Sequence, residues 1–279
     1  MSNPSIDPGA DGAKMDFADA MSYGDYLGIE AILGEQRPLS DAHDELLFII
    51  QHQTSELWMK LIIHEIMAAR SALKAGDTAN MFKMLARISR IFEQLNNQWD
   101  VLRTMTPADY TRFREVLGQS SGFQSYQYRL IEFALGNRNI NMLKPHEQTP
   151  DVHRILKGEL ARPSLYDEVV AVLFETIDGH RNDMPAPQLD RPHEASPAIQ
   201  ARWKTVYENI DAYWMLYKLG EKLVDLEDYF RRWRFNHVTT VERVIGFKRG
   251  TGGTSGVQYL HRMLSVELFP ELWHVRGEL

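Results

Sequence analysis

Residues 41–65, DAHDELLFIIQHQTSELWMKLIIHE, decide the fold class of this chain. At about 3.6 residues per turn, the stretch is long enough for roughly six or seven turns of helix. Two of its faces carry side chains at helical spacing, with Leu46, Ile50, Gln53, Leu57, Leu61 and His64 on one and Phe48, His52, Ser55, Met59 and Ile62 on the other. A helix that is apolar on more than one face is typically buried. We therefore expect this helix, and His52 with it, to lie inside the core.

A histidine in that position has two interpretations. His52 follows an aromatic residue, Phe48, by one turn and precedes Ser55 by another. Most buried polar groups are simply hydrogen-bonded, so a satisfied core histidine is the commoner case. The alternative is that His52 faces a ligand cavity.

The composition excludes several classes of function. The chain has 279 residues and no cysteine, which removes disulfides, thiolate ligands, iron–sulfur clusters and cysteine nucleophiles. Its net charge of −7 gives a nucleic-acid partner no electrostatic support. No run approaches the roughly 20 apolar residues of a membrane span, and the first residues lack the apolar core of a signal peptide. We expect a cytoplasmic protein with no nucleic-acid or membrane partner.

The rest of the chain also reads as helical. Residues 1–20 are rich in Gly, Pro, Ser and Asp, a composition typical of a disordered tail. Helical periodicity recurs after this tail, over 81–104, 126–135, 163–177, 197–246 and 257–264, and Pro270 is expected to stop or kink the end of the chain. No alternating pattern typical of strands occurs. We predict an all-α fold in which residues 21–279 form one large, bundle-like helical domain.

A second histidine shares the pattern of His52. His237 continues an apolar series spaced 3, 4, 3 and 4 residues apart, formed by Leu223, Leu226, Phe230 and Trp233. Two imidazoles from separate long helices suit a haem protein, in which iron takes one imidazole and leaves the opposite face for dioxygen. Spacing alone still favours two unrelated core histidines.

Other metal sites have weaker support. His52 and Glu56 could place two ligands on one helix face, but Glu56 also stands four residues before Lys60, the spacing of a surface ion pair. Glu271 and His274 form a single Glu-x-x-His pattern. Di-iron bundles need that pattern twice, with two further glutamates.

Two further motifs are candidates for binding. Tyr110 and Arg114 lie four residues apart in a short helix that begins at Thr106-Pro107, and arginine grips a carboxylate through two parallel hydrogen bonds. The alternative is that Tyr110 and Arg114 simply form a pair on the protein surface. The glycine-rich loop 250–256 does not fit a phosphate-binding pattern. It is either a lid over a pocket, with Thr251 supplying a hydroxyl, or a surface loop.

Five blocks in order resemble the tryptophan 2,3-dioxygenase family: FIIQHQTSELWMK, the Tyr-x-x-x-Arg helix, SSGFQSYQYR, RRWRFNHVTTVERVIG and GTGGTSG-x-x-YL. The resemblance runs from about Tyr23 to the last residue. It implies an all-helical subunit with one haem b in a pocket between long helices, assembled as a homotetramer built from dimers. It also implies that both atoms of O2 enter the indole C2=C3 bond of L-tryptophan, giving N-formylkynurenine, the first step of tryptophan degradation by the kynurenine pathway.

The resemblance implies a role for particular residues. His237 would be the proximal iron ligand, and His52 the distal histidine beside the indole nitrogen. Phe48 would pack on the indole, Arg114 with Tyr110 would clamp the carboxylate, and Thr251 would contact the ammonium and carboxylate groups. Residues at the haem edge would be Trp99, Ser121 and Gly122, and those reaching a neighbouring subunit's pocket would be Tyr23, Tyr26 and Leu27.

Some alternatives stay open at this point. His52 could take a proton from the substrate or only accept a hydrogen bond. A haem-based sensor or carrier that binds O2 or an indole without turnover is the second candidate function, although such a carrier has no need of the Tyr110–Arg114 clamp. A helical scaffold without a cofactor is the third.

Overall fold

The computed structural model describes residues 7–279 and divides into two units, one ending at Pro38 and the other formed by Leu39–Leu279. In the first unit, α1 (Tyr23–Leu27) and α2 (Ile29–Leu33) are short helices that meet at Gly28, whose φ of 62° suits glycine. Residues 1–6 of the predicted tail lie outside the described residues, and 7–22 carry no helix. The disorder of the tail and the boundary at residue 20 stay predictions.

The second unit is built from helices of very different lengths. Its elements are α3 (His43–Lys74), α4 (Thr78–Leu102), α5 (Pro107–Phe113), α6 (Tyr126–Leu135), α7 (Pro150–Leu160), α8 (Leu165–Asp178), α9 (Pro197–Glu208), α10 (Trp214–Val244), α11 (Val257–Leu264) and α12 (Pro270–His274), with 3-10 turns at Arg114–Leu117, Gly122–Gln124, Ile140–His146 and Val275–Glu278. No strand occurs between residues 7 and 279, which confirms the predicted all-α class.

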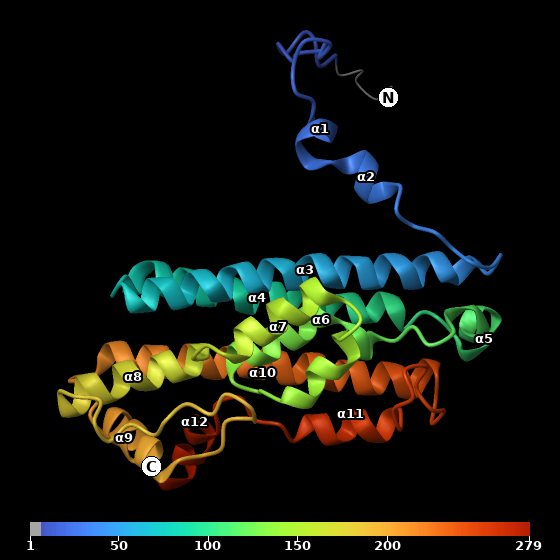
Figure 1. Cartoon of the computed structure of the whole chain (residues 1–279). Coiled ribbons are helices and arrows are strands. Elements are labelled where there is room, and N and C mark those ends of the chain that lie inside the picture. The colour runs from blue at the N-terminus through green and yellow to red at the C-terminus, as the bar shows by residue number, and fades with distance from the viewer. Residues whose placement is uncertain (1–6) are drawn as a thin grey trace, which may run out of the picture. The chain divides into compact units, whose positions relative to one another are not determined.

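Three long helices form the framework of this unit (Figure 1). α3 and α4 pack along each other as a hairpin, and α10 packs along α4. Gly76 lies in the hairpin turn with a φ of 71°, a left-handed conformation that favours glycine. Because α4 contacts both other helices, it joins the helix that carries His52 to the helix that carries His237.

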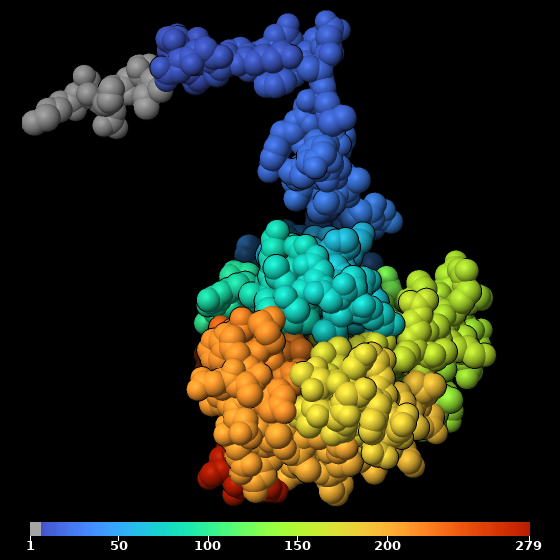
Figure 2. Space-filling view, turned by 90° about the vertical axis from the view of Figure 1, so that its left-hand side faces the viewer, coloured from blue at the N-terminus to red at the C-terminus, as the bar shows by residue number. Residues whose placement is uncertain are grey.

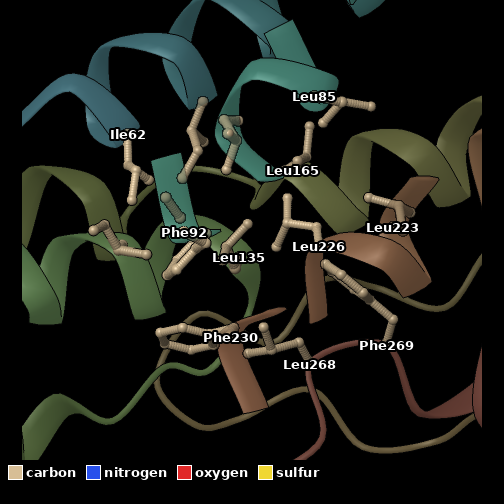
Figure 3. Close-up of a cluster of buried hydrophobic side chains, with 14 of the residues drawn as sticks. Ile62, Leu85, Phe92, Leu135, Leu165, Leu223, Leu226, Phe230, Leu268 and Phe269 are labelled. Atoms are coloured by element: carbon tan, nitrogen blue, oxygen red, sulfur yellow. The ribbon is translucent and has the colours of Figure 1, made fainter. Parts of the chain in front are cut away.

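The core lies between these helices and α8 (Figure 3). Phe92 of α4 and Phe230 of α10 meet with their ring centroids 5.2 Å apart, and Ile62 of α3 is fully buried beside them. Burying a side chain of this size contributes about 1.5–3 kcal/mol. Figure 2 shows the end of the unit at which the α3–α4 turn, α8 and the start of α10 come together.

One face of α3 does not follow the prediction. Leu46, Ile50 and Leu57 are 43%, 46% and 52% exposed, although the sequence led us to expect both apolar faces of this helix in the core. The helices α4, α5, α6 and α8 pack on the other faces of α3 and leave this one at the surface of the unit. The prediction of burial was wrong for this face.

Two other predicted elements differ from the structure. The periodic pattern over 197–246 is interrupted at residues 209–213, so it forms α9 and α10 rather than one helix. Pro270 begins α12 instead of stopping a helix, as proline is tolerated in the first turn. No helix in the described part of the chain is long and apolar enough to cross a membrane.

Candidate functional site

A large cavity lies within the second unit. It holds about 1650 Å³ of empty space, a figure that includes the part open to solvent. Its walls come from α3, α4, α5, α6, α10, α11 and two loops. It brings together most of the residues singled out in the sequence, namely Phe48, His52, Trp99, Tyr110, Arg114, Ser121, Gly122, His237 and Thr251.

His52 faces the open space of this cavity. Its Nδ1 lies 2.7 Å from the backbone carbonyl of Phe48. Because a carbonyl can only accept, this contact assigns the proton to Nδ1 and leaves a lone pair on Nε2. The Phe48 ring packs against the imidazole, with centroids 4.2 Å apart. The side chain is accessible from the cavity yet surrounded by protein, so His52 lines a pocket, the alternative interpretation, instead of packing within the core.

The surrounding protein keeps the His52 ring neutral. Loss of hydration lowers the pKa of His52 below its usual value, and the Phe48 carbonyl and the Glu56 carboxylate partly oppose this effect. A neutral ring with a free lone pair can accept a hydrogen bond from a ligand.

His237 lies between two indoles. Its ring stacks on Trp99 of α4, with centroids 5.2 Å apart and an angle of 19°, and it contacts Trp233 of its own helix at 5.5 Å. Burial, with a smaller effect of the nearby His52, lowers the pKa of His237 to about 4. A neutral imidazole is the form that binds a metal. The apolar series from Leu223 to Trp233 is buried, as predicted.

The wall near His237 combines two buried indole N–H groups with positively charged side chains that line the cavity. Within residues 7–279, the Nε1 atoms of Trp99 and Trp233 are buried and have no partner, and an indole N–H can only donate. Leaving such a group unpaired costs about 1–3 kcal/mol. Arg129 and Arg234 also line the cavity and share one carboxylate, that of Glu132. This wall therefore suits a ligand that carries carboxylates.

A second polar group, Tyr110 and Arg114, lines another part of the cavity. Tyr110 is buried on α5, where burial raises its pKa and Arg114 opposes the shift. Arg114 follows α5 in the 3-10 turn, and its Nη2 donates to the carbonyl of Arg249 at 2.9 Å. Its Nε is buried without a partner in the described part of the chain. The guanidinium lines the cavity and gives this part of it a positive charge that suits an acidic ligand.

The loop 249–256 closes one wall of the cavity. The Thr251 hydroxyl donates to the carbonyl of Ser120 at 2.5 Å. A Cβ on Gly252 would stand 2.8 Å from the Cβ of Ser121. Only glycine permits so close an approach of the two loops. Residues of this loop, Thr251 among them, line the cavity, so it is a wall of the pocket rather than a plain surface loop.

The weaker metal patterns have other partners in the structure. The Glu56 carboxylate accepts a hydrogen bond from Gln127 at 2.7 Å instead of pairing with Lys60 as the spacing suggested. Glu271 is fully buried and accepts from Tyr166, while His274 pairs with Glu267. Within residues 7–279, no group of three or more His, Asp or Glu is arranged to hold a metal ion.

Some lining residues were missed in the sequence. Gln51 lines the cavity beside His52 and was not singled out, although it precedes His52 directly, and Ser55, which the spacing placed on the His52 face, was not given a role in the site. Arg234 precedes His237 by three residues, but Arg129 comes from a different helix and carries no local signal. Tyr23, Tyr26 and Leu27 belong to the separate unit of residues 7–38, where both tyrosines are more than 75% exposed. Their role stays a prediction.

Comparisons with known proteins identify the family of the chain. The family model described as tryptophan 2,3-dioxygenase matches residues 8–174 and 164–279. A protein named tryptophan 2,3-dioxygenase from a Ruegeria species is 74% identical over 279 residues and covers all of both chains. Proteins of the same name from Ruegeria pomeroyi and Bradyrhizobium diazoefficiens are 64% and 63% identical, over 98% and 99% of each chain. The chain therefore belongs to the tryptophan 2,3-dioxygenase family.

Proposed function

We propose that this protein is a haem-dependent dioxygenase that inserts both atoms of O2 into the indole C2=C3 bond of L-tryptophan, giving N-formylkynurenine. The observation that carries the proposal is the convergence, in one cavity, of a neutral imidazole from α3, a neutral imidazole from α10 and the Arg114 guanidinium. The names of relatives that are 63–74% identical over nearly their whole length support it.

The chemistry of the cavity wall fits haem b. His237 would be the iron ligand, since its ring is neutral and the Trp99 and Trp233 rings pack against it. Arg129 and Arg234 line the cavity and share the single carboxylate of Glu132, and the remaining positive charge suits the two carboxylates of haem b. Ser121 and Gly122 would form the wall at its edge. When bound, haem supplies the redox chemistry that activates dioxygen. We propose one haem per subunit, because one cavity offers this donor set.

The other residues of the cavity match the parts of tryptophan. The Phe48 ring lines the cavity, backed by the buried Phe113 ring at 5.5 Å, and would pack on the indole. The substrate carboxylate would lie on Arg114, with the Tyr110 hydroxyl beside it, and Thr251 would contact the ammonium and carboxylate groups. Burying a zwitterion without such partners would be costly. Arg114 and Thr251 should therefore control affinity for tryptophan.

His52 would hold the indole in place through its Nε2 atom. The hydrogen bond from Nδ1 to the Phe48 carbonyl fixes the ring and leaves Nε2 as the acceptor for the indole N–H. The same atom is the place where a proton would go if His52 acts as a base. In either role the protein orients the indole and excludes water from the reacting atoms.

We also propose a homotetramer built from dimers. Two exposed apolar surfaces support it: the face of α3 with Leu46, Ile50 and Leu57, and the tyrosines of α1. Tyr23, Tyr26 and Leu27 would reach the pocket of a neighbouring subunit. Light scattering of the purified protein tests the assembly, and a mass equal to one chain would contradict it. A cytoplasmic location stays a prediction from the sequence.

The function is tested directly with purified protein made under ample porphyrin supply. We expect a Soret band and, after adding L-tryptophan, a reductant and isotopically labelled dioxygen, N-formylkynurenine that carries both labelled atoms by mass spectrometry. Haem and tryptophan binding without product would favour the sensor or carrier. A colourless protein under these conditions would contradict the haem proposal.

A further inference from the structure

An arginine at the C-terminal end of α4 contacts the turn of α10 that carries His237. Arg103 follows the last residue of α4 and donates from Nε to the Thr240 hydroxyl at 3.0 Å. Its Nη2 faces the side-chain oxygens of Asn236 at 2.8 Å and Thr239 at 2.9 Å. These three partners flank His237 on both sides along the helix. The guanidinium therefore fixes the turn from residue 236 to residue 240 against α4.

The same end of α4 also contacts the His237 ring itself. Trp99, one turn before Arg103, stacks on the imidazole. One turn earlier again, Asn96 accepts a hydrogen bond from Asn236 at 2.9 Å and donates to the carbonyl of Tyr229 at 3.1 Å. The last turns of α4 thus determine both the register of α10 and the surface on which the imidazole rests.

This arrangement differs from the usual way in which a metal-binding histidine is oriented. Such a histidine commonly donates its second ring N–H to a carboxylate or a backbone carbonyl, which fixes the ring. In the described part of the chain, no hydrogen bond involves the ring of His237. Its direction then depends on ring stacking and on the position of its helix turn, which Arg103 holds.

We propose that Arg103 is a positioning residue for the iron ligand: by holding residues 236–240 of α10 on α4, it fixes the direction of the His237 imidazole toward the haem iron. The inference rests on the proposed function, in which His237 binds the iron. In most metal sites, a hydrogen bond to the ring itself orients the histidine. Here the hydrogen bonds of Arg103 to helix residues on either side of His237 take that role.

A simpler role for Arg103 is general helix packing. Its ion pair with Asp100 involves a carboxylate that is 79% exposed, and such surface pairs contribute only about 0–1 kcal/mol. A packing role would change the stability of the protein without altering the bond between iron and histidine. The two roles are therefore separated by a spectroscopic measurement.

The test uses the haem-loaded protein with Arg103→Met, which keeps a long side chain and removes the donors. We expect the iron–histidine stretching band of the ferrous protein, measured by resonance Raman spectroscopy, to shift or broaden. Haem transfer to apomyoglobin should become faster by about 10-fold, the lower end of the effect of removing an outer partner of a metal ligand.

Two controls are matched to this variant. Arg90→Met removes an arginine within α4 that, like Arg103, pairs with a carboxylate three residues away, that of Glu93, and Asp100→Asn removes only the surface ion pair of Arg103. Both should keep the wild-type band and transfer rate. Thr240→Val removes the acceptor for Arg103 Nε and should reproduce part of the effect, whereas Thr240→Ser, which retains the hydroxyl, should restore wild-type behaviour.

The outcomes that overturn the proposal are distinct. An Arg103→Met protein with an unchanged band and an unchanged transfer rate overturns it, whatever its thermal stability. If Arg103→Met does not fold, the Thr240 pair decides, and Val and Ser variants with the same band overturn it. A wild-type protein without an iron–histidine band would instead contradict His237 as the ligand, and with it the proposed function.

Discussion

The two histidines of the cavity are held in opposite ways. His52 is hydrogen-bonded by its own helix, through the carbonyl of Phe48, and its other nitrogen faces open space. His237 has no hydrogen bond to its ring in the described part of the chain and lies against two indoles. The turn of helix around it is fixed by a different helix through Arg103.

The difference shows what each side of the cavity is suited to do. The His52 side combines a fixed tautomer with an accessible lone pair, which suits a ligand that comes and goes. The His237 side combines a neutral ring with rigid packing, which suits a group that stays. The following predictions test this division, beginning with the largest effect.

His237→Ala should abolish haem binding and activity, because it removes the only imidazole on the packed side of the cavity described here. Absorption of the purified variant and the yield of N-formylkynurenine check this. A variant that keeps a full Soret band and full turnover would show that His237 does not bind the iron.

Arg114→Ala should raise KM for tryptophan by about 10-fold or more, since a charge-assisted hydrogen bond is worth about 1.5–3 kcal/mol. Haem content should not change. Steady-state kinetics with Arg112→Ala, an exposed arginine two residues away, provide the control. An unchanged KM would remove Arg114 from the substrate clamp.

His52→Ala should leave haem bound and lower kcat/KM by about 10-fold if the ring only accepts a hydrogen bond, as a neutral bond contributes about 0.5–1.5 kcal/mol. If His52 is a required base, essentially no turnover should remain. His64→Ala changes an exposed histidine of the same helix and serves as the control. Wild-type kinetics in His52→Ala would exclude both roles.

The pH profile should show the smallest effect. Because the pKa of His52 is lowered, its lone pair survives as the pH falls through 6.5, and the acidic limb of kcat/KM should lie below that value. Glu56 and His237 are the titratable groups that act on this ring. Glu56→Gln removes the opposing carboxylate and should move the limb to lower pH. A limb above pH 6.5, or one that moves upward in this variant, would contradict the environment assigned to His52.

The helices and their ends could largely be predicted from the sequence because their signals are local. Thr106 and Asp109 form a capping box around Pro107, and α6 ends at Gly136. The apolar spacing of α10 placed His237 correctly on the packed side. The spacing of apolar residues does not show which face of a helix other helices of the same chain will cover. Leu46 and Ile50 were therefore predicted to lie in the core, although they are exposed.

The contacts that orient the site were beyond the sequence because they join distant residues. Glu56 meets Gln127, 71 residues away, and Arg103 meets Thr240, 137 residues away. An arginine at the end of a helix has no local feature that separates a surface ion pair from a contact across the fold. Such pairings follow only from the packing of α3, α4 and α10.

The hydrogen bond between His52 and the Phe48 carbonyl also bears on inhibitor design. An azole that points a bare nitrogen at Nε2 would set two lone pairs against each other. A compound with an N–H at that point and an acid group within reach of Arg114 would satisfy both walls. Compounds screened against this pocket should be ranked first by the position of their hydrogen-bond donors and only then by the size of their aromatic groups.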